Sequence, residues 1–162
     1  MVKRPLPPRS DVGVLPAVQR LDHQLCFALY SSSLLMTKLY KPVLAPLGLT
    51  YPQYLVLLVL WETDGIPVGE LGTRLYLDSG TLTPLLKRME AAGLLTRSRA
   101  ADDERRVIVA LTAPGRALRR KAEHVPHHVA CATGCELDEI VALTARLQRL
   151  RGRVADQVAL AA

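Results

Sequence analysis

The sequence contains no apolar run long enough to cross a lipid bilayer. Its longest apolar stretch, Leu55 to Trp61, is far shorter than the roughly 20 residues that a membrane-spanning helix needs. The first residues also lack the apolar core of a secretory signal peptide. We therefore expect the protein to act in the cytoplasm.

Aromatic residues and cysteines are scarce. Aromatic residues make up 4% of the 162 residues, whereas leucine, alanine and valine are abundant, and this balance favours a helical protein over a β-sandwich. The 3 cysteines are an odd number in a chain that is large enough to fold without disulfides. We therefore expect a mainly α-helical protein with at least one free thiol and no permanent disulfide framework.

The chain carries an excess of positive charge. The formal net charge is +6 and the pI is near 9.5, which fits a polyanionic partner such as nucleic acid. Many basic proteins without such a partner have similar values. The net charge alone therefore leaves both interpretations open.

Proline and glycine positions predict the organisation of the chain. Residues 1–16 contain four prolines and cannot sustain a helix, so we expect a flexible arm followed by a single domain over residues 17–162. Apolar residues then recur at helical spacing in several segments, one of which, before Glu62, is apolar almost all round and should be buried. Tyr54 and Tyr76 are expected in the core. The predicted helices cover residues 17–45, 50–62, 67–74, 78–92 and 112–125, and a last helix follows Glu136.

A change of period predicts a small β-hairpin. Residues 94–99 and 106–111 read as two strands around a charged connector. The order of helix, short helix, turn, helix and charged hairpin is typical of a winged helix-turn-helix, which we place over residues 50–112. In this arrangement the helix over 78–92 would enter the major groove of DNA.

Polar side chains on that helix and on the hairpin are the candidate DNA contacts. Small hydroxyls near the helix start suit base edges and phosphates, and cations further along suit phosphates. An alternative is that the hairpin cations only solvate the loop. The candidates on the helix are Ser79, Thr81, Thr83, Lys87 and Arg88, with Leu82, Leu85, Leu86 and Met89 facing inward, and those on the hairpin are Arg97, Arg99, Arg105 and Arg106. Pro84 would either kink this helix or restart it with Thr83 as its cap.

The hairpin sequence resembles the wing of the MarR family of regulators. The stretch from Asp103 to Thr112, followed by Gly115, matches the family's combination of acidic-basic pair, strand and capped helix. The resemblance implies that Asp103 holds Arg105 near the wing tip. It also implies an intertwined homodimer formed by the helices over 17–46 and 113–160, which would bind palindromic double-stranded operator DNA.

Within that family, three segments resemble the organic hydroperoxide regulators of the OhrR subfamily. These segments are residues 21–30, 49–55 and 75–88. The resemblance implies that an organic hydroperoxide is the inducer and that Cys26 is the sensing thiol, in a pocket with Tyr30, where Tyr40 and Tyr51 of the partner subunit donate hydrogen bonds to the thiolate. It also implies the two-cysteine type, in which Cys131 attacks the sulfenic acid of Cys26 and forms an intersubunit disulfide that releases the operator. Cys135 is either a substitute for Cys131 or a structural thiol.

The sequence also allows three other interpretations. A repressor of this family could be released by a small aromatic ligand, with its cysteines incidental. A thiol peroxidase could use Cys26 and Cys131, although a basic wing has no role in an enzyme, so we expect no enzymatic activity. A metal site is disfavoured because Pro126 and Gly134 disturb the helix that would carry its four ligands, and we expect neither metal nor cofactor. The four residues are His124, His128, Cys131 and Cys135.

Overall fold

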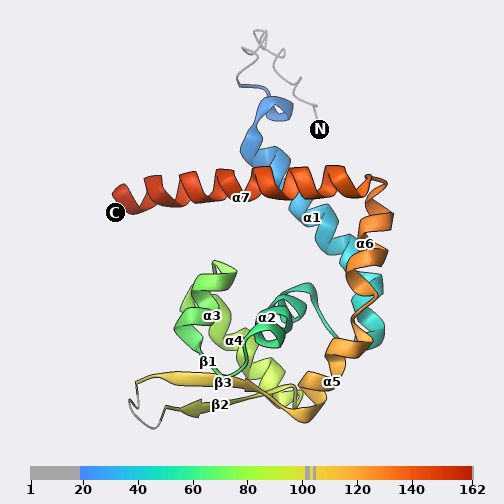
Figure 1. The fold of residues 1–162 in the computed structure, drawn as a ribbon. Coiled ribbons are helices and arrows are strands. Elements are labelled where there is room, and N and C mark those ends of the chain that lie inside the picture. The colour runs from blue at the N-terminus through green and yellow to red at the C-terminus, as the bar shows by residue number, and fades with distance from the viewer. Residues whose placement is uncertain (1–18, 101–102, 104, 162) are drawn as a thin grey trace, which may run out of the picture. The chain divides into compact units, whose positions relative to one another are not determined.

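The computed structural model describes residues 19–100, 103 and 105–161 (Figure 1). The predicted arm over residues 1–16 lies outside them. The chain divides into two compact units, residues 1–38 and 39–162. In the described part of the chain, no single helix is long and apolar enough to cross a membrane, and only the bent pair 25–47 and 51–62 meets that criterion when its two helices are taken together.

The first unit contains a 3₁₀ helix, η2 (Leu21–His23), and most of α1 (Leu25–Leu44). The predicted start of this helix near residue 17 is wrong, because α1 begins only at Leu25. Gln24 interrupts the helix with an extended backbone, φ −87° and ψ 116°. Leu21 remains 58% exposed, so no packing within this unit draws the preceding turn into the helix.

The second unit contains the predicted series of helices and strands. A 3₁₀ helix, η3 (Ala45–Leu47), follows α1, and the order of elements from there confirms the predicted winged helix-turn-helix. The elements are α2 (Tyr51–Glu62), β1 (Ile66–Pro67), α3 (Val68–Leu75), α4 (Ser79–Ala91), β2 (Leu95–Arg99), β3 (Val107–Leu111), α5 (Ala113–Lys121), α6 (Val125–Thr133) and α7 (Leu137–Leu160).

Polar side chains fix the helix ends where the sequence predicts them. The Asp78 carboxylate accepts a hydrogen bond of 2.9 Å from the Thr81 amide at the start of α4. The Thr112 hydroxyl likewise accepts one of 3.2 Å from the Gly115 amide at the start of α5. Gly93 follows α4 with φ +70°, a left-handed conformation that glycine adopts without strain. Asp78 and Gly93 therefore mark the two ends of α4, and Thr112 marks the start of α5.

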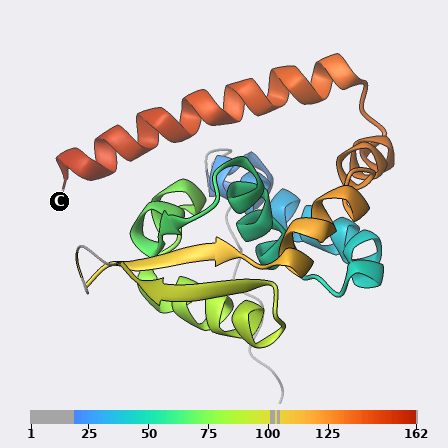
Figure 2. The ribbon, with the colours of Figure 1, turned by 60° about the horizontal axis from the view of Figure 1, so that its bottom comes forward.

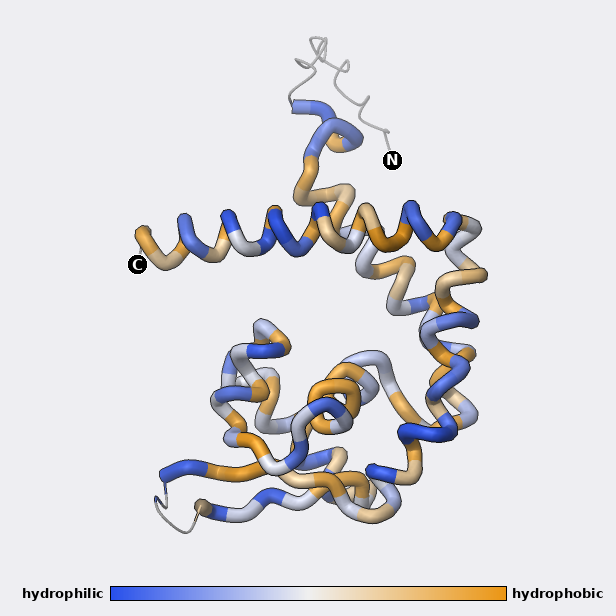
Figure 3. Tube along the Cα trace, viewed as in Figure 1, coloured by the Kyte–Doolittle hydropathy of each residue, from blue (hydrophilic) through white to orange (hydrophobic). Residues whose placement is uncertain are grey.

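Helix α2 forms the centre of the core, as its all-apolar sequence predicts. Tyr54, Val56, Leu57 and Leu60 are almost fully buried, and α2 contacts α3, α4 and α5. Figure 3 shows the hydrophobic residues of this helix in orange. Burial of a leucine or valine side chain contributes about 1.5–3 kcal/mol. The buried helix α2 therefore supports α3 and α4 of the helix-turn-helix.

The sheet has three antiparallel strands in the order β1-β3-β2. The hairpin register pairs Leu95 with Leu111 and Arg99 with Val107, and α4 packs beside β2 (Figure 2). The sequence predicts the hairpin but misses β1, a two-residue strand whose Ile66 pairs with Val109. So short a strand has no periodicity to detect.

The C-terminal part differs from the prediction in one helix. The predicted helix over 112–125 ends at Lys121, and α6 follows as a separate helix. Pro126 does not interrupt that helix, because it lies in the first turn of α6, where a missing N–H costs nothing. Helix α7 then runs for 24 residues without one buried side chain in this single chain, and Leu137 and Val154 are 69% and 52% exposed.

Candidate DNA-binding surface and thiol region

Helix α4 has one buried and one exposed face, as predicted. Leu82, Leu85, Leu86 and Met89 are buried. On the opposite face, Ser79, Thr81, Lys87 and Arg88 are exposed and Thr83 is half-buried. The polar candidates therefore share one accessible surface of α4.

Pro84 lies within α4 without dividing it. The helix is continuous from Ser79 to Ala91, so it does not restart with Thr83 as a cap. Pro84 is exposed, and its ring therefore does not disturb the packed face. The helix keeps its apolar contacts while it carries a proline on its outer side.

Asp78 stabilises the first turn of α4 with its charge. The backbone and hydroxyl of Thr81 both donate hydrogen bonds to this carboxylate, at 2.9 and 3.0 Å, and they lower the pKa of Asp78 below its usual value. The carboxylate therefore stays ionised near neutral pH and complements the positive end of the helix dipole.

The wing contains the acidic-basic pair that the family resemblance implies. The Asp103 carboxylate accepts hydrogen bonds from the backbone N–H and the Nε of Arg105, at 3.0 and 3.2 Å. The Arg105 side chain is 92% exposed, whereas that of Asp103 is 32% exposed. Asp103 thus orients a guanidinium that projects into solvent.

Arg97 has a partner that the sequence does not suggest. Glu90 of α4 accepts hydrogen bonds from the backbone N–H, Nε and Nη2 of Arg97 at 2.7 to 3.0 Å, and these bonds lower the pKa of Glu90. The pair connects α4 to β2, so the wing strand is fixed to the helix. Arg99 and Arg106 are exposed, and DNA contact by all three arginines stays a prediction.

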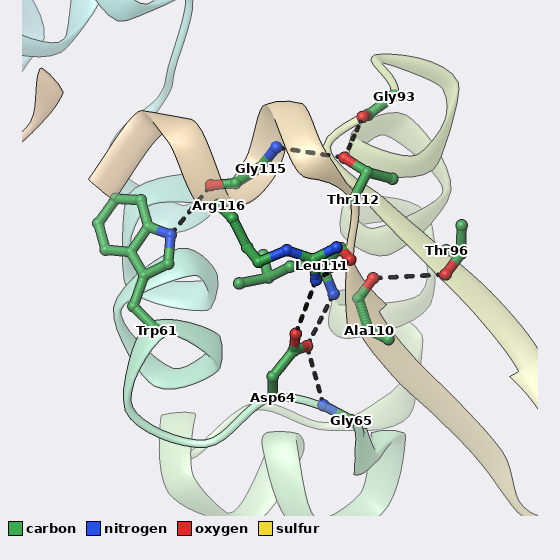
Figure 4. A network of polar contacts seen from close by, with 10 residues as sticks. All are labelled: Trp61, Asp64, Gly65, Gly93, Thr96, Ala110, Leu111, Thr112, Gly115 and Arg116. Atoms are coloured by element: carbon green, nitrogen blue, oxygen red, sulfur yellow. Dashed lines mark hydrogen bonds and ion pairs between the residues drawn. The ribbon is translucent and has the colours of Figure 1, made fainter. Parts of the chain in front are cut away.

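A polar network joins the end of α2 to β3 and α5 (Figure 4). The Asp64 carboxylate accepts hydrogen bonds from the Leu111 amide at 2.7 Å and from Arg116 Nη1 at 3.1 Å. The Trp61 indole N–H donates to the Gly115 carbonyl at 3.0 Å. Sequence reasoning missed this network because its partners are about 50 residues apart. It holds the wing strand against the central helix.

Three tyrosines and Trp61 form an aromatic cluster within the second unit. The ring centroids of Tyr40 and Tyr51 are 4.5 Å apart, and that of Tyr54 lies 6.1 Å from both Tyr40 and Trp61. Burial, with smaller contributions from Tyr51 and Tyr54, raises the pKa of Tyr40 to about 12. Burial also raises the pKa of Tyr51. Both phenols therefore remain protonated hydrogen-bond donors at neutral pH.

The raised pKa of Tyr40 predicts a loss of stability in alkali. The folded state favours the neutral phenol, so this contribution is complete below about pH 10 and is lost as the pH rises towards about 12. We expect Tyr40→Phe to flatten the fall in urea stability between about pH 10 and 12, the interval between the ordinary and the raised pKa of this phenol. Tyr30→Phe is the control, since Tyr30 is 62% exposed, and an equal effect of both variants would contradict the prediction.

The predicted core position of Tyr76 is wrong. Tyr76 ends α3 with φ +56° and is 62% exposed. Its backbone makes the left-handed turn between α3 and α4, which points the ring away from the core. The guanidinium of Arg151 lies 4.7 Å from the ring centroid, a cation–π contact.

The three cysteines are free thiols. Cys26 belongs to the first unit and is exposed on α1, as is Tyr30. Cys131 is exposed on α6, with its sulfur 3.8 and 3.9 Å from the two ring nitrogens of His127. His127 was missed, although its spacing of four residues from Cys131 is a usable signal. Cys135 is half-buried just beyond α6.

The four candidate metal ligands do not form a site in the described part of the chain. No group of three or more histidine, cysteine, aspartate or glutamate side chains is arranged there to hold a metal ion.

Comparisons with known proteins agree with this geometry. A family model described as transcriptional regulator SarA/Rot matches residues 38–121. The chain is 57% identical over 107 residues to the organic hydroperoxide resistance transcriptional regulator of Bacillus subtilis, covering 66% of this chain and 73% of that protein. It is 53% identical over 133 residues to the transcriptional regulator TtmR of Methylorubrum extorquens, covering 82% and 68%.

Solved structures of AbfR are also similar to this chain. The crystal structure of AbfR of Staphylococcus epidermidis superposes with a TM-score of 0.68 at 35% identity and covers 85% of this chain and 95% of that one. Reduced AbfR bound to DNA gives a TM-score of 0.67. Fold, wing and relatives together define a winged helix-turn-helix transcriptional regulator that binds DNA. The chain belongs to the MarR-type family of these regulators, with the organic hydroperoxide resistance regulator among its relatives.

Proposed function

We propose that this protein is a dimeric repressor that releases its operator when an organic hydroperoxide oxidises Cys26. The observation that carries the proposal is the position of Cys26 and Tyr30 in a segment resembling OhrR, in a chain 57% identical to an organic hydroperoxide resistance regulator. The phenols of Tyr40 and Tyr51, protonated at neutral pH, support it as donors to a thiolate. As a transcriptional regulator, the protein would act in the cytoplasm.

The proposed oxidation occurs in two balanced steps. The Cys26 thiolate attacks the terminal peroxide oxygen, the O–O bond breaks, and an alcohol leaves while Cys26 becomes a sulfenic acid. Cys131 of the other subunit then attacks this sulfur, and water is released as the disulfide forms. His127 lies near the Cys131 sulfur and can take up its proton. The related AbfR has been solved in a disulfide-formed state, at 38% identity and a TM-score of 0.57.

The proposed DNA interface consists of the outer face of α4 and the wing. Hydroxyls at the start of α4 would meet bases and phosphates, and the cations would meet phosphates. The oriented Arg105 would reach the neighbouring backbone or minor groove. The proposed contacts are Ser79, Thr81, Thr83, Lys87, Arg88, Arg97, Arg99, Asp103, Arg105 and Arg106.

The uncovered apolar side chains support a homodimer. Leu25 and Leu29 on α1, and Leu143 and Leu147 on α7, are exposed in the single chain. Such side chains recur along both helices, and a contiguous exposed apolar surface normally marks an interface. We propose dimerisation through residues 17–46 and 113–160, which would place two winged helix-turn-helix regions, residues 50–112, on a palindromic operator.

Operator release under organic hydroperoxide, followed by non-reducing electrophoresis, tests the proposal. Wild type should release DNA as a disulfide-linked dimer, Cys26→Ser should remain bound, and Cys131→Ser should form no linked dimer. Cys135→Ser is the matched control and should behave as wild type. If Cys26→Ser dissociates from the operator at the same hydroperoxide concentration as wild type, the redox proposal is wrong. That result would favour a repressor released by a small aromatic ligand.

A further inference from the structure

Pro84 changes the hydrogen bonding of the outer face of α4. In an α-helix, each carbonyl accepts from the N–H four residues later. Proline has no N–H, so the Gly80 carbonyl loses its α-helical donor at position 84. Since α4 continues through Pro84, this carbonyl lies in the first turn of a continuous helix.

Both residues lie on the accessible side of α4. Gly80 and Pro84 are exposed, as are Ser79 and Lys87. Gly80 has no side chain to cover its own carbonyl. Within residues 19–100, 103 and 105–161, the side-chain hydrogen bonds at the start of α4 join Thr81 to Asp78, and no side chain donates to the Gly80 oxygen. An exposed carbonyl without an intrahelical donor binds water, and a donor on a DNA base can replace that water.

We propose that the Gly80 carbonyl is a base-reading group of this regulator and that its partner is an exocyclic amine in the major groove. Two bases present such an amine there, adenine through N6 and cytosine through N4. Thymine and guanine present the acceptors O4 and O6 to the same groove, and an acceptor facing the carbonyl is unfavourable. The inference requires that α4 enters the major groove, and it is independent of the cysteine chemistry.

The expected discrimination between bases with and without the amine is the contribution of one hydrogen bond. Such a bond contributes about 3- to 10-fold in affinity. In a symmetric dimer the effect occurs in both half-sites, at mirror-related positions. Pro84→Ala restores an N–H at position 84, which can donate to Gly80 and withdraw the carbonyl from the base. Alanine also favours the helix, so the variant should fold.

The first experiment selects duplexes from a library with randomised half-sites. It uses reduced protein without hydroperoxide and compares wild type with Pro84→Ala. We expect wild type to prefer adenine or cytosine at one position in each half-site. Pro84→Ala should lose that preference and keep the base preferences at all other positions. Lys87→Ala is the control, because loss of a phosphate contact should weaken all duplexes about equally.

Deleting the amine from the base gives the second test. In the selected duplex, adenine is replaced by purine, or cytosine by 2-pyrimidinone, so that only the exocyclic amine is lost. Wild-type affinity should fall about 3- to 10-fold and Pro84→Ala affinity should not change. Equal losses in both proteins, or an unchanged preference in Pro84→Ala, would overturn the proposal. A wild-type preference for thymine would also overturn it, in favour of contact between the proline ring and the thymine methyl.

Discussion

Arg105→Ala is expected to weaken operator binding by about 10²- to 10⁴-fold. Hydrogen bonds to charged groups contribute about 1.5–3 kcal/mol each, and a dimer loses two. Asp103 already holds the Arg105 guanidinium, so little ordering entropy opposes its contact with DNA. Two fewer phosphate contacts should also lower the slope of log affinity against log salt by about 2. Titrations of labelled operator at several salt concentrations measure both quantities.

Lys121→Ala is the charge-matched control for Arg105→Ala. Lys121 is exposed at the end of α5, and α5 follows β3 at Leu111, the end of that strand opposite Val107 (Figure 1). Its removal should change affinity by less than about twofold, because it meets no phosphate in the proposed interface. Asp103→Ala should give an intermediate loss, since Arg105 remains but is no longer oriented. Equal losses for Arg105→Ala and Lys121→Ala would show that net charge, and not the wing tip, drives binding.

Gly115→Ala is expected to lower the free energy of unfolding by about 3 kcal/mol or more. A Cβ at this position would lie 2.0 Å from the Leu94 carbonyl oxygen and 3.2 Å from the Leu111 side chain. The Leu94 oxygen accepts the Thr112 amide at 3.1 Å, so it has no freedom to retreat. The added methyl would force α5 away from the hairpin and strain the bond between Trp61 and Gly115. Urea denaturation at a fixed protein concentration measures the loss.

Gly69→Ala is the control for Gly115→Ala. Gly69 lies in the first turn of α3, and a Cβ there meets nothing within 4 Å. Alanine is preferred over glycine in a helix by about 0.5–1 kcal/mol, so this variant should be as stable as wild type or slightly more so. If Gly115→Ala unfolds at the same urea concentration as Gly69→Ala, the backbones of α5 and residue 94 are not in close contact.

The order of elements was predictable because local signals carry it. Caps at Asp78 and Thr112 and the change of period at the hairpin gave the winged helix-turn-helix nearly residue by residue. The start of α1 was not predictable, because apolar periodicity continues to Leu21, whose side chain is 58% exposed and adds little packing. Strand β1 was missed for a different reason, since its two residues are extended only through pairing with β3.

The sequence predicts those site residues that helical spacing or family resemblance identifies. The polar face of α4 follows from helical spacing, and the pair of Asp103 and Arg105 followed from family resemblance. Glu90 and Asp64 were missed, because their partners come from other elements and are known only once the chain is folded. Tyr76 was misplaced because hydrophobic character indicates the core, whereas its left-handed backbone turns the ring outward. The roles of Cys26 and Cys131 stay predictions.

The hydrogen bond from Arg97 to Glu90 also protects an edge of the sheet. Unpaired N–H groups on an outer strand can template the addition of a strand from another molecule, which leads to aggregation. On β2 the outward N–H of Arg97 is occupied by the Glu90 carboxylate. On the opposite edge, β1 ends in Pro67, which has no N–H to offer. The sheet is thus closed to extension at both of these points.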